Sequence, residues 1–169
     1  MVGGPTLRLT GDMPSPRTLR ASRTLPVEVG AAFDAVLPMP LPRIFCRRFA
    51  ALPPIKDVRD QSGVWGTVGQ TRTIVLADRG TMRETLTAVS PGASFGYRIE
   101  PMTGPLTPLV SAAEGTWAFA PAGTGVEVSW QWVVEPTRAG SMVMPVFARM
   151  WQGYARQALE EIERALVPR

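Results

Sequence analysis

Hydrophobic and polar residues alternate along the segment VEVSWQWVV, which spans residues 126–134. One face carries Val126, Val128, Trp130, Trp132 and Val134, and the other face is mostly polar. A period of two residues is typical of a half-buried β-strand. Two tryptophans on one face are hard to place in a tightly packed core, because each buries roughly 200 Å² and its indole N–H needs a partner. The pattern therefore predicts a strand of a curved sheet that surrounds a space.

Short strands separated by turn residues account for most of the chain. We predict strands at residues 18–27, 56–62, 70–77, 82–89, 94–101, 111–120 and 125–135. The sequences DRG, SPG, MTGP and PAGTG punctuate the later strands, and connections this short make neighbouring strands antiparallel. On one of these strands Ala113, Gly115, Trp117 and Phe119 share a face, so small residues stand beside large rings.

Apolar residues spaced by three and four positions predict helices. Residues 29–36 form one such stretch, and the prolines that follow limit residues 44–49 to a short helix or turn. The longest stretch, residues 141–166, predicts an amphipathic helix of about 39 Å at the usual rise per residue. Pro145 lies near the start of this helix, or it separates a leading turn from the main helix.

Gly, Pro, Ser and Thr are frequent at the start of the chain, and we expect residues 1–17 to form a flexible tail. The remaining residues, 18–169, are numerous enough to form a single domain with a sizeable core.

Composition excludes several kinds of site. The chain contains no histidine, which excludes Ser-His-Asp triads and zinc sites that use histidine. Its one cysteine, Cys46, has no partner for an intrachain disulfide and is expected to be a small apolar filler. The glycines near residues 66 and 123 lack the spacing of phosphate-binding loops. We therefore expect neither a metal nor a cofactor.

The formal net charge is +4, and the isoelectric point is about 10.2. Nearly all basic residues are arginines scattered among acidic residues, which favours a solvated surface over a nucleic-acid-binding one. No apolar run approaches the roughly 20 residues of a membrane span, and the N-terminus lacks the apolar region of a signal peptide. We therefore expect a cytoplasmic protein without a membrane span or a nucleic-acid partner, either a monomer or a homodimer.

The order of a strand, two short helices, six antiparallel strands and a long C-terminal helix resembles the START-like, Bet v 1-like helix-grip superfamily. Its bacterial branch of polyketide cyclase/dehydrase or lipid-transport proteins is the most similar. The segments that carry the resemblance are LPVEVGAAFDAV, MRETLTAVSPG, SFGYRIEPMTGP and GTGVEVSWQWVVEP. The resemblance implies an α+β fold in which a curved seven-stranded antiparallel sheet wraps around the long helix and encloses a hydrophobic cavity. Trp130 and Trp132 would then face that cavity.

Glu84 is a carboxylate on an otherwise apolar strand face. Its neighbours on that face are Met82, Leu86 and Ala88. An inward glutamate is costly unless it is paired, and burial raises its pKa. Two interpretations stay open. Glu84 either reaches water or pairs with an arginine such as Arg72 or Arg98, or it contacts the polar head of a ligand. The second role is that of the matching glutamate in the abscisic-acid receptors of this superfamily.

The candidate ligand-binding residues are Glu84, Tyr97, Trp117, Phe119, Trp130, Trp132, Phe147, Met150, Trp151 and Tyr154. Those on the final helix are equally consistent with plain core packing. One hypothesis is non-catalytic binding of a hydrophobic small molecule, such as a lipid, an isoprenoid or a polyketide-like compound. The alternative is an enzyme of the polyketide cyclase/dehydratase type in which Glu84 is the catalytic acid or base. The sequence leaves open whether the chain is an enzyme.

Overall fold

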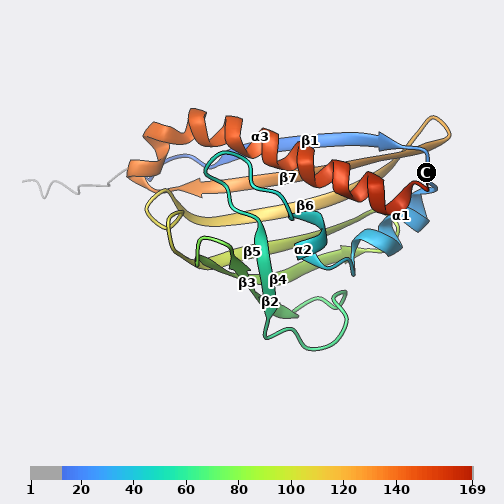
Figure 1. The fold of residues 1–169 in the computed structure, drawn as a ribbon, viewed down its shortest axis with the longest axis horizontal. Helices are drawn as coiled ribbons and strands as arrows, with labels where there is room; N and C mark the ends of the chain where they lie inside the picture. Colours follow the sequence, from blue (N-terminus) through green and yellow to red (C-terminus); the bar gives the residue numbers. More distant parts are fainter. Residues whose placement is uncertain (1–12, 169) are drawn as a thin grey trace, which may run out of the picture.

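Seven antiparallel strands form one curved sheet in the computed structural model, which describes residues 13–168 (Figure 1). The strands are β1 (Arg17–Leu25), β2 (Ile55–Arg59), β3 (Thr71–Leu76), β4 (Thr81–Ser90), β5 (Ser94–Thr103), β6 (Val110–Ala122) and β7 (Gly125–Pro136). Strands β2 to β7 follow one another in the sheet, and β1 pairs with β7. The predicted α+β helix-grip architecture is therefore confirmed.

Three helices accompany the sheet in the described part of the chain: α1 (Val29–Val36), α2 (Leu41–Ile44) and α3 (Arg138–Leu166). The long helix α3 runs beside β1 and β7, and α2 contacts both α3 and β2 (Figure 1). The inward side chains of the strands pack toward these helices and form one hydrophobic core. This arrangement places the core between the sheet and α3, where the site described below lies.

The capping residues explain where two of the helices begin. The carboxylate of Glu28 accepts hydrogen bonds from the backbone N–H groups of Gly30 and Ala31, at 2.9 and 2.8 Å. Thr137 caps α3 in the same way, because its hydroxyl accepts from the N–H of Gly140. The helix therefore begins at Arg138, three residues before the predicted start, and it continues through Pro145 without a break.

One expectation needs correction, and another falls mostly outside the described residues. The alternation that predicts an inward Ala88 fails, because the pairing of β4 with β5 is irregular between Leu86 and Ala88 and leaves Ala88 exposed. The expected tail, residues 1–17, falls mostly on residues 1–12, which lie outside the described residues, and β1 already begins at Arg17.

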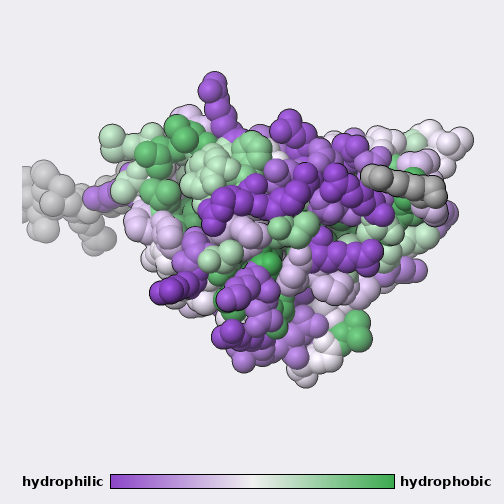
Figure 2. Space-filling view, viewed as in Figure 1, coloured by the Kyte–Doolittle hydropathy of each residue, from purple (hydrophilic) through white to green (hydrophobic). Residues whose placement is uncertain are grey.

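Hydrophobic side chains are also exposed where α3 begins, and Figure 2 shows them gathered at that end of the molecule. They include Met142, Val143 and Val146. Within residues 13–168, no helix is both long enough and apolar enough to cross a membrane.

Candidate functional site

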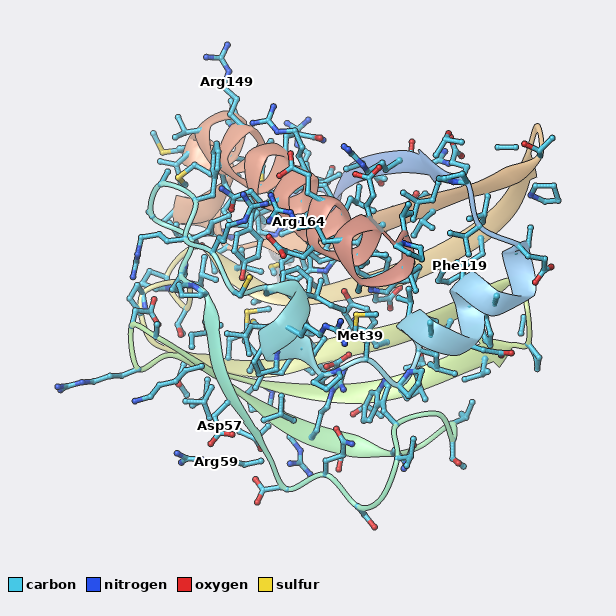
Figure 3. All side chains as sticks on the ribbon, turned by 45° about the vertical axis from the view of Figure 1, so that its right-hand side comes forward. Met39, Asp57, Arg59, Phe119, Arg149 and Arg164 are labelled. Atoms are coloured by element: carbon cyan, nitrogen blue, oxygen red, sulfur yellow. The ribbon has the colours of Figure 1, made fainter. Side chains whose placement is uncertain are left out.

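A cavity lies between the inner face of the sheet and α3. Its walls come from strands β2 to β7, from α3, and from the segment 36–55 that contains α2. Met39, in the connection between α1 and α2, is one of the wall residues and is labelled in Figure 3. The cavity volume that the centres of water molecules can reach is about 70 Å³. Most of the lining residues are aliphatic or aromatic. About five waters, or one compact organic molecule, fill such a volume.

Several indole rings pack against one another in the wall of the cavity. The rings of Trp117 and Trp130 are nearly parallel, with centroids 5.3 Å apart and an interplanar angle of 9°. Trp151 of α3 lies on another side of Trp130, at 4.8 Å between centroids, and Phe45 lies at 5.1 Å. Trp130 and Trp132 thus face the cavity, and much of the space that the alternation predicts is filled by these rings themselves.

Tyr97 is the partner of both indole N–H groups on β7. Its phenol oxygen accepts a hydrogen bond from Trp130 Nε1 at 2.7 Å and another from Trp132 Nε1 at 2.8 Å. The side chain is buried, and burial raises the pKa of the phenol, with a further rise from the Glu84 carboxylate. Tyr97 therefore stays protonated at neutral pH.

Glu84 is paired with Arg72, which stands directly opposite it on β3. Arg72 Nε donates to one carboxylate oxygen at 2.8 Å, and its terminal Nη2 donates to the other at 3.2 Å. Both side chains are buried, at 4% and 2% exposure for Arg72 and Glu84. Burial raises the pKa of the Glu84 carboxyl, while the charge and hydrogen bonds of Arg72 oppose the rise. Each carboxylate oxygen therefore accepts one hydrogen bond from the guanidinium.

Arg72 is one of the two expected partners, and the other, Arg98, faces away from the cavity. Arg98 hydrogen-bonds Glu100, Glu114 and Glu135 on the solvent side of the sheet. Sequence reasoning missed a third group at this site, Trp65, whose buried ring lies 3.8 Å below the guanidinium carbon of Arg72. Trp65 belongs to the segment between β2 and β3, where no periodicity signals its direction.

Three of the four candidates on α3 line the cavity: Phe147, Trp151 and Tyr154. The Tyr154 hydroxyl donates to the carbonyl oxygen of Pro53 at 2.8 Å, and its ring stacks on Phe45. Trp151 is only 1% exposed, and its indole N–H has no hydrogen-bond partner within the described residues.

Two candidates do not line the cavity. Phe119 lies at the end of the sheet covered by α1, where its ring packs edge-on against Phe33 at 5.6 Å (Figure 3). Met150 is partly buried against the core, because it lies on the flank of the helix stripe formed by Phe147, Trp151 and Tyr154. Both residues contribute to packing.

A metal centre is not built into this site: among residues 13–168, no three His, Cys, Asp or Glu side chains gather closely enough to hold an ion. Glu84 is the one carboxylate among the described residues that line the cavity.

Solved structures with the same architecture share little sequence with this chain. The major latex-like protein 151 of Panax ginseng is 15% identical, with a TM-score of 0.69, over 92% of this chain and all 100% of that protein. A protein from Thermus thermophilus is 14% identical, with a TM-score of 0.65, over 89% of this chain and 97% of its own. A Chromobacterium violaceum protein is 17% identical, with a TM-score of 0.59, over 90% and 98%.

Curated proteins offer no match to the sequence. The family described as "Polyketide cyclase / dehydrase and lipid transport" matches residues 16–167, a range that contains the seven strands, the three helices and the whole cavity described above. Together with the helix-grip architecture, this match shows that the chain belongs to the polyketide cyclase/dehydrase and lipid transport family, within the START-like, Bet v 1-like superfamily.

Proposed function

We propose that this protein binds a compact, mostly apolar small molecule in the cavity between the sheet and α3, and that it does so without catalysing a reaction. The observation that carries the proposal is the ring-lined cavity, in which the charged groups neutralise each other. Removing an apolar body from water stabilises a complex by about 25 cal/mol for each Å² buried. A free charge on the ligand would lack a counter-charge, because Arg72 and Glu84 already form an ion pair.

The ion pair also argues against the enzymatic alternative. A carboxylate held by a bidentate guanidinium is a weaker base than an unpaired one, because the positive charge favours its deprotonated form. Both oxygens of Glu84 accept hydrogen bonds from Arg72 in this arrangement. The phenol of Tyr97 is protonated and the phenol of Tyr154 donates to Pro53, so neither supplies a base.

Two matched variants test where the ligand binds. Ile74 lines the cavity, whereas Val75, the next residue of β3, points to the opposite face of the sheet and is half-buried. Ile74→Phe adds a ring to the cavity, and Val75→Phe adds a ring outside it. The parent and both variants are screened against one- and two-ring hydrocarbons and ketones, fatty acids and nucleotides, with the melting temperature and tryptophan fluorescence as readouts.

We expect ring compounds to stabilise the parent and Val75→Phe but not Ile74→Phe. A ligand at about 100 times its dissociation constant adds roughly 2.7 kcal/mol to the free energy of unfolding. Mass spectrometry of the recovered compounds should find them unchanged. Stabilisation by nucleotides alone would contradict the proposed ligand class, equal responses of the two variants would contradict the location, and a converted compound would contradict the absence of catalysis.

A further inference from the structure

The hydrogen bonds of Tyr97 determine which polar group the cavity offers to a ligand. An indole N–H can only donate, so the phenol oxygen must be the acceptor in its bonds with both Trp130 and Trp132. These two bonds use the accepting capacity of the oxygen. The hydrogen of the phenol is therefore left to point elsewhere, as a donor.

Within the described part of the chain, no oxygen accepts a hydrogen bond from Tyr97. The carboxylate of Glu84 is the one charged acceptor in the described lining, and its hydrogen bonds come from Arg72 and not from Tyr97. The carbonyl oxygen of Pro53, another acceptor in the lining, accepts a hydrogen bond from the hydroxyl of Tyr154 and none from Tyr97. Tyr97 is 6% exposed and lines the cavity, so bulk water is not a ready acceptor either.

A second donor without a partner borders the same space. The indole N–H of Trp151 is buried and, among residues 13–168, has nothing to bond to. Its ring lies 6.3 Å from the ring of Trp132, whose own N–H is held by Tyr97. The unmatched polar groups of the cavity are thus donors. An unmet buried donor is costly, and a ligand oxygen that accepts from it removes that cost.

We infer that the ligand is a neutral carbonyl compound, a ketone, ester or lactone on an apolar ring body, whose oxygen accepts a hydrogen bond from the Tyr97 hydroxyl. This inference rests on the proposed function, because it specifies the ligand of the same cavity. A carboxylate also accepts hydrogen bonds, but it carries a charge that no unpaired cation in the described lining balances. The two indole N–H groups pull electron density from the phenol oxygen and make its O–H a stronger donor. Because burial keeps the phenol protonated, this donor persists at neutral and mildly alkaline pH.

Two probes of nearly the same shape separate hydrogen bonding from apolar burial: α-tetralone and tetralin, which differ by the carbonyl oxygen. Both are measured by titration calorimetry on the full chain, with naphthoate as the charged probe. The variants are Tyr97→Phe and, as the matched control, Tyr154→Phe, which removes a cavity hydroxyl already committed to Pro53. The decisive quantity is the ratio of the two affinities, which cancels any general change in the cavity.

We expect the ratio of the affinities for α-tetralone and tetralin to be the same in the parent and in Tyr154→Phe. In Tyr97→Phe this ratio should be about tenfold smaller. Naphthoate should bind more weakly than α-tetralone. If Tyr97→Phe does not fold, the infrared carbonyl stretch of α-tetralone bound to the parent shows whether the carbonyl accepts a hydrogen bond. A hydrogen-bonded carbonyl absorbs at lower wavenumber than the same compound in cyclohexane.

Two different failures are distinguishable. Equal binding of tetralin and α-tetralone by the parent, an unchanged ratio in Tyr97→Phe, or a carbonyl stretch as in cyclohexane overturns the inference and leaves apolar binding standing. Tighter binding of naphthoate than of α-tetralone overturns it as well. Failure of the parent to bind either neutral probe, or any other apolar ring compound, overturns the proposed function and this inference together.

Discussion

The ring of Tyr97 occupies the place that a side chain at Gly115 would take. The two residues are direct partners on β5 and β6. A Cβ atom on Gly115 would lie 2.0 Å from Cζ of Tyr97 and 2.3 Å from its hydroxyl oxygen. The glycine therefore lets the phenol cross the neighbouring strand and reach Trp132, which pairs with Gly115 from the other side. The missing side chain on β6 thus lets a phenol of β5 bond two indoles of β7.

Gly115→Ala should displace the Tyr97 ring and weaken its bonds with Trp130 and Trp132. Overpacking of this kind lowers the free energy of unfolding by about 1–3 kcal/mol. Gly96→Ala is the matched control on the adjacent strand, because its Cβ would meet no atom closer than 3.5 Å. Urea unfolding measures both variants, and the indole N–H signals in an NMR spectrum report on Trp130 and Trp132. If both variants unfold together and the indole signals stay in place, the contact between Tyr97 and Gly115 is not as described.

Alternation along the strands is sufficient to predict that Tyr97, Glu84 and the strand tryptophans face the same side. The period of two holds wherever the pairing is regular. It fails at Ala88, where the pairing shifts. It does not determine how far along the sheet a side chain lies. Phe119 faces inward as predicted, but it packs against Phe33 of α1 and is not among the residues that line the cavity.

The partners of the buried polar groups are harder to predict than their direction. Tyr97 and Trp130 are 33 residues apart in the chain, and their hydrogen bond depends on the register of three strands and on the space over Gly115. Arg72 and Arg98 are equal candidates for Glu84 in the sequence, because both stand on neighbouring strands. The register separates them, since Arg72 pairs with Glu84 itself and Arg98 pairs with Thr85, whose side chain faces the other way.

The start of α3 can be tested through its cap. Thr137→Ala removes the hydroxyl that accepts from Gly140 and also donates to the Pro108 carbonyl, so it should lower the free energy of unfolding by about 1 kcal/mol. Ser141, the predicted first residue of the helix, lies inside it, and its side chain bonds only the carbonyl of Arg138 among the described residues. Ser141→Ala should leave stability within about 0.5 kcal/mol of the parent, because alanine favours a helix interior. Thermal unfolding compares the pair, and a larger loss in Ser141→Ala would place the cap at Ser141.

Replacing one partner of the Arg72–Glu84 pair should lower the free energy of unfolding far more than replacing both partners. Arg72→Met leaves a buried carboxylate without its guanidinium and is expected to lower the free energy of unfolding by about 3–5 kcal/mol. The double variant Arg72→Met/Glu84→Met replaces both charges with apolar side chains of similar length and should recover most of that loss. Urea unfolding of the parent, the single variants and the double variant gives the coupling energy. Additive losses would show that the two side chains do not act as a pair.

The pH dependence of Arg72→Met follows from the direction of the Glu84 pKa. Burial raises this pKa above its usual 4.5, and Arg72 opposes the rise, so the variant has a higher pKa in the folded state than the parent has. A carboxyl whose pKa is raised on folding holds its proton more tightly in the folded state, and its contribution to stability is present below the unfolded pKa and lost as the pH rises through the folded pKa. Arg72→Met should therefore regain stability as the pH falls from 7 toward about 4.5, by at most about 1.4 kcal/mol per pH unit.

Arg72→Met/Glu84→Met has no carboxyl at this position and serves as the reference at each pH. A difference between the two variants that does not change with pH would mean that Glu84 reaches water once Arg72 is gone, and that its burial depends on the arginine.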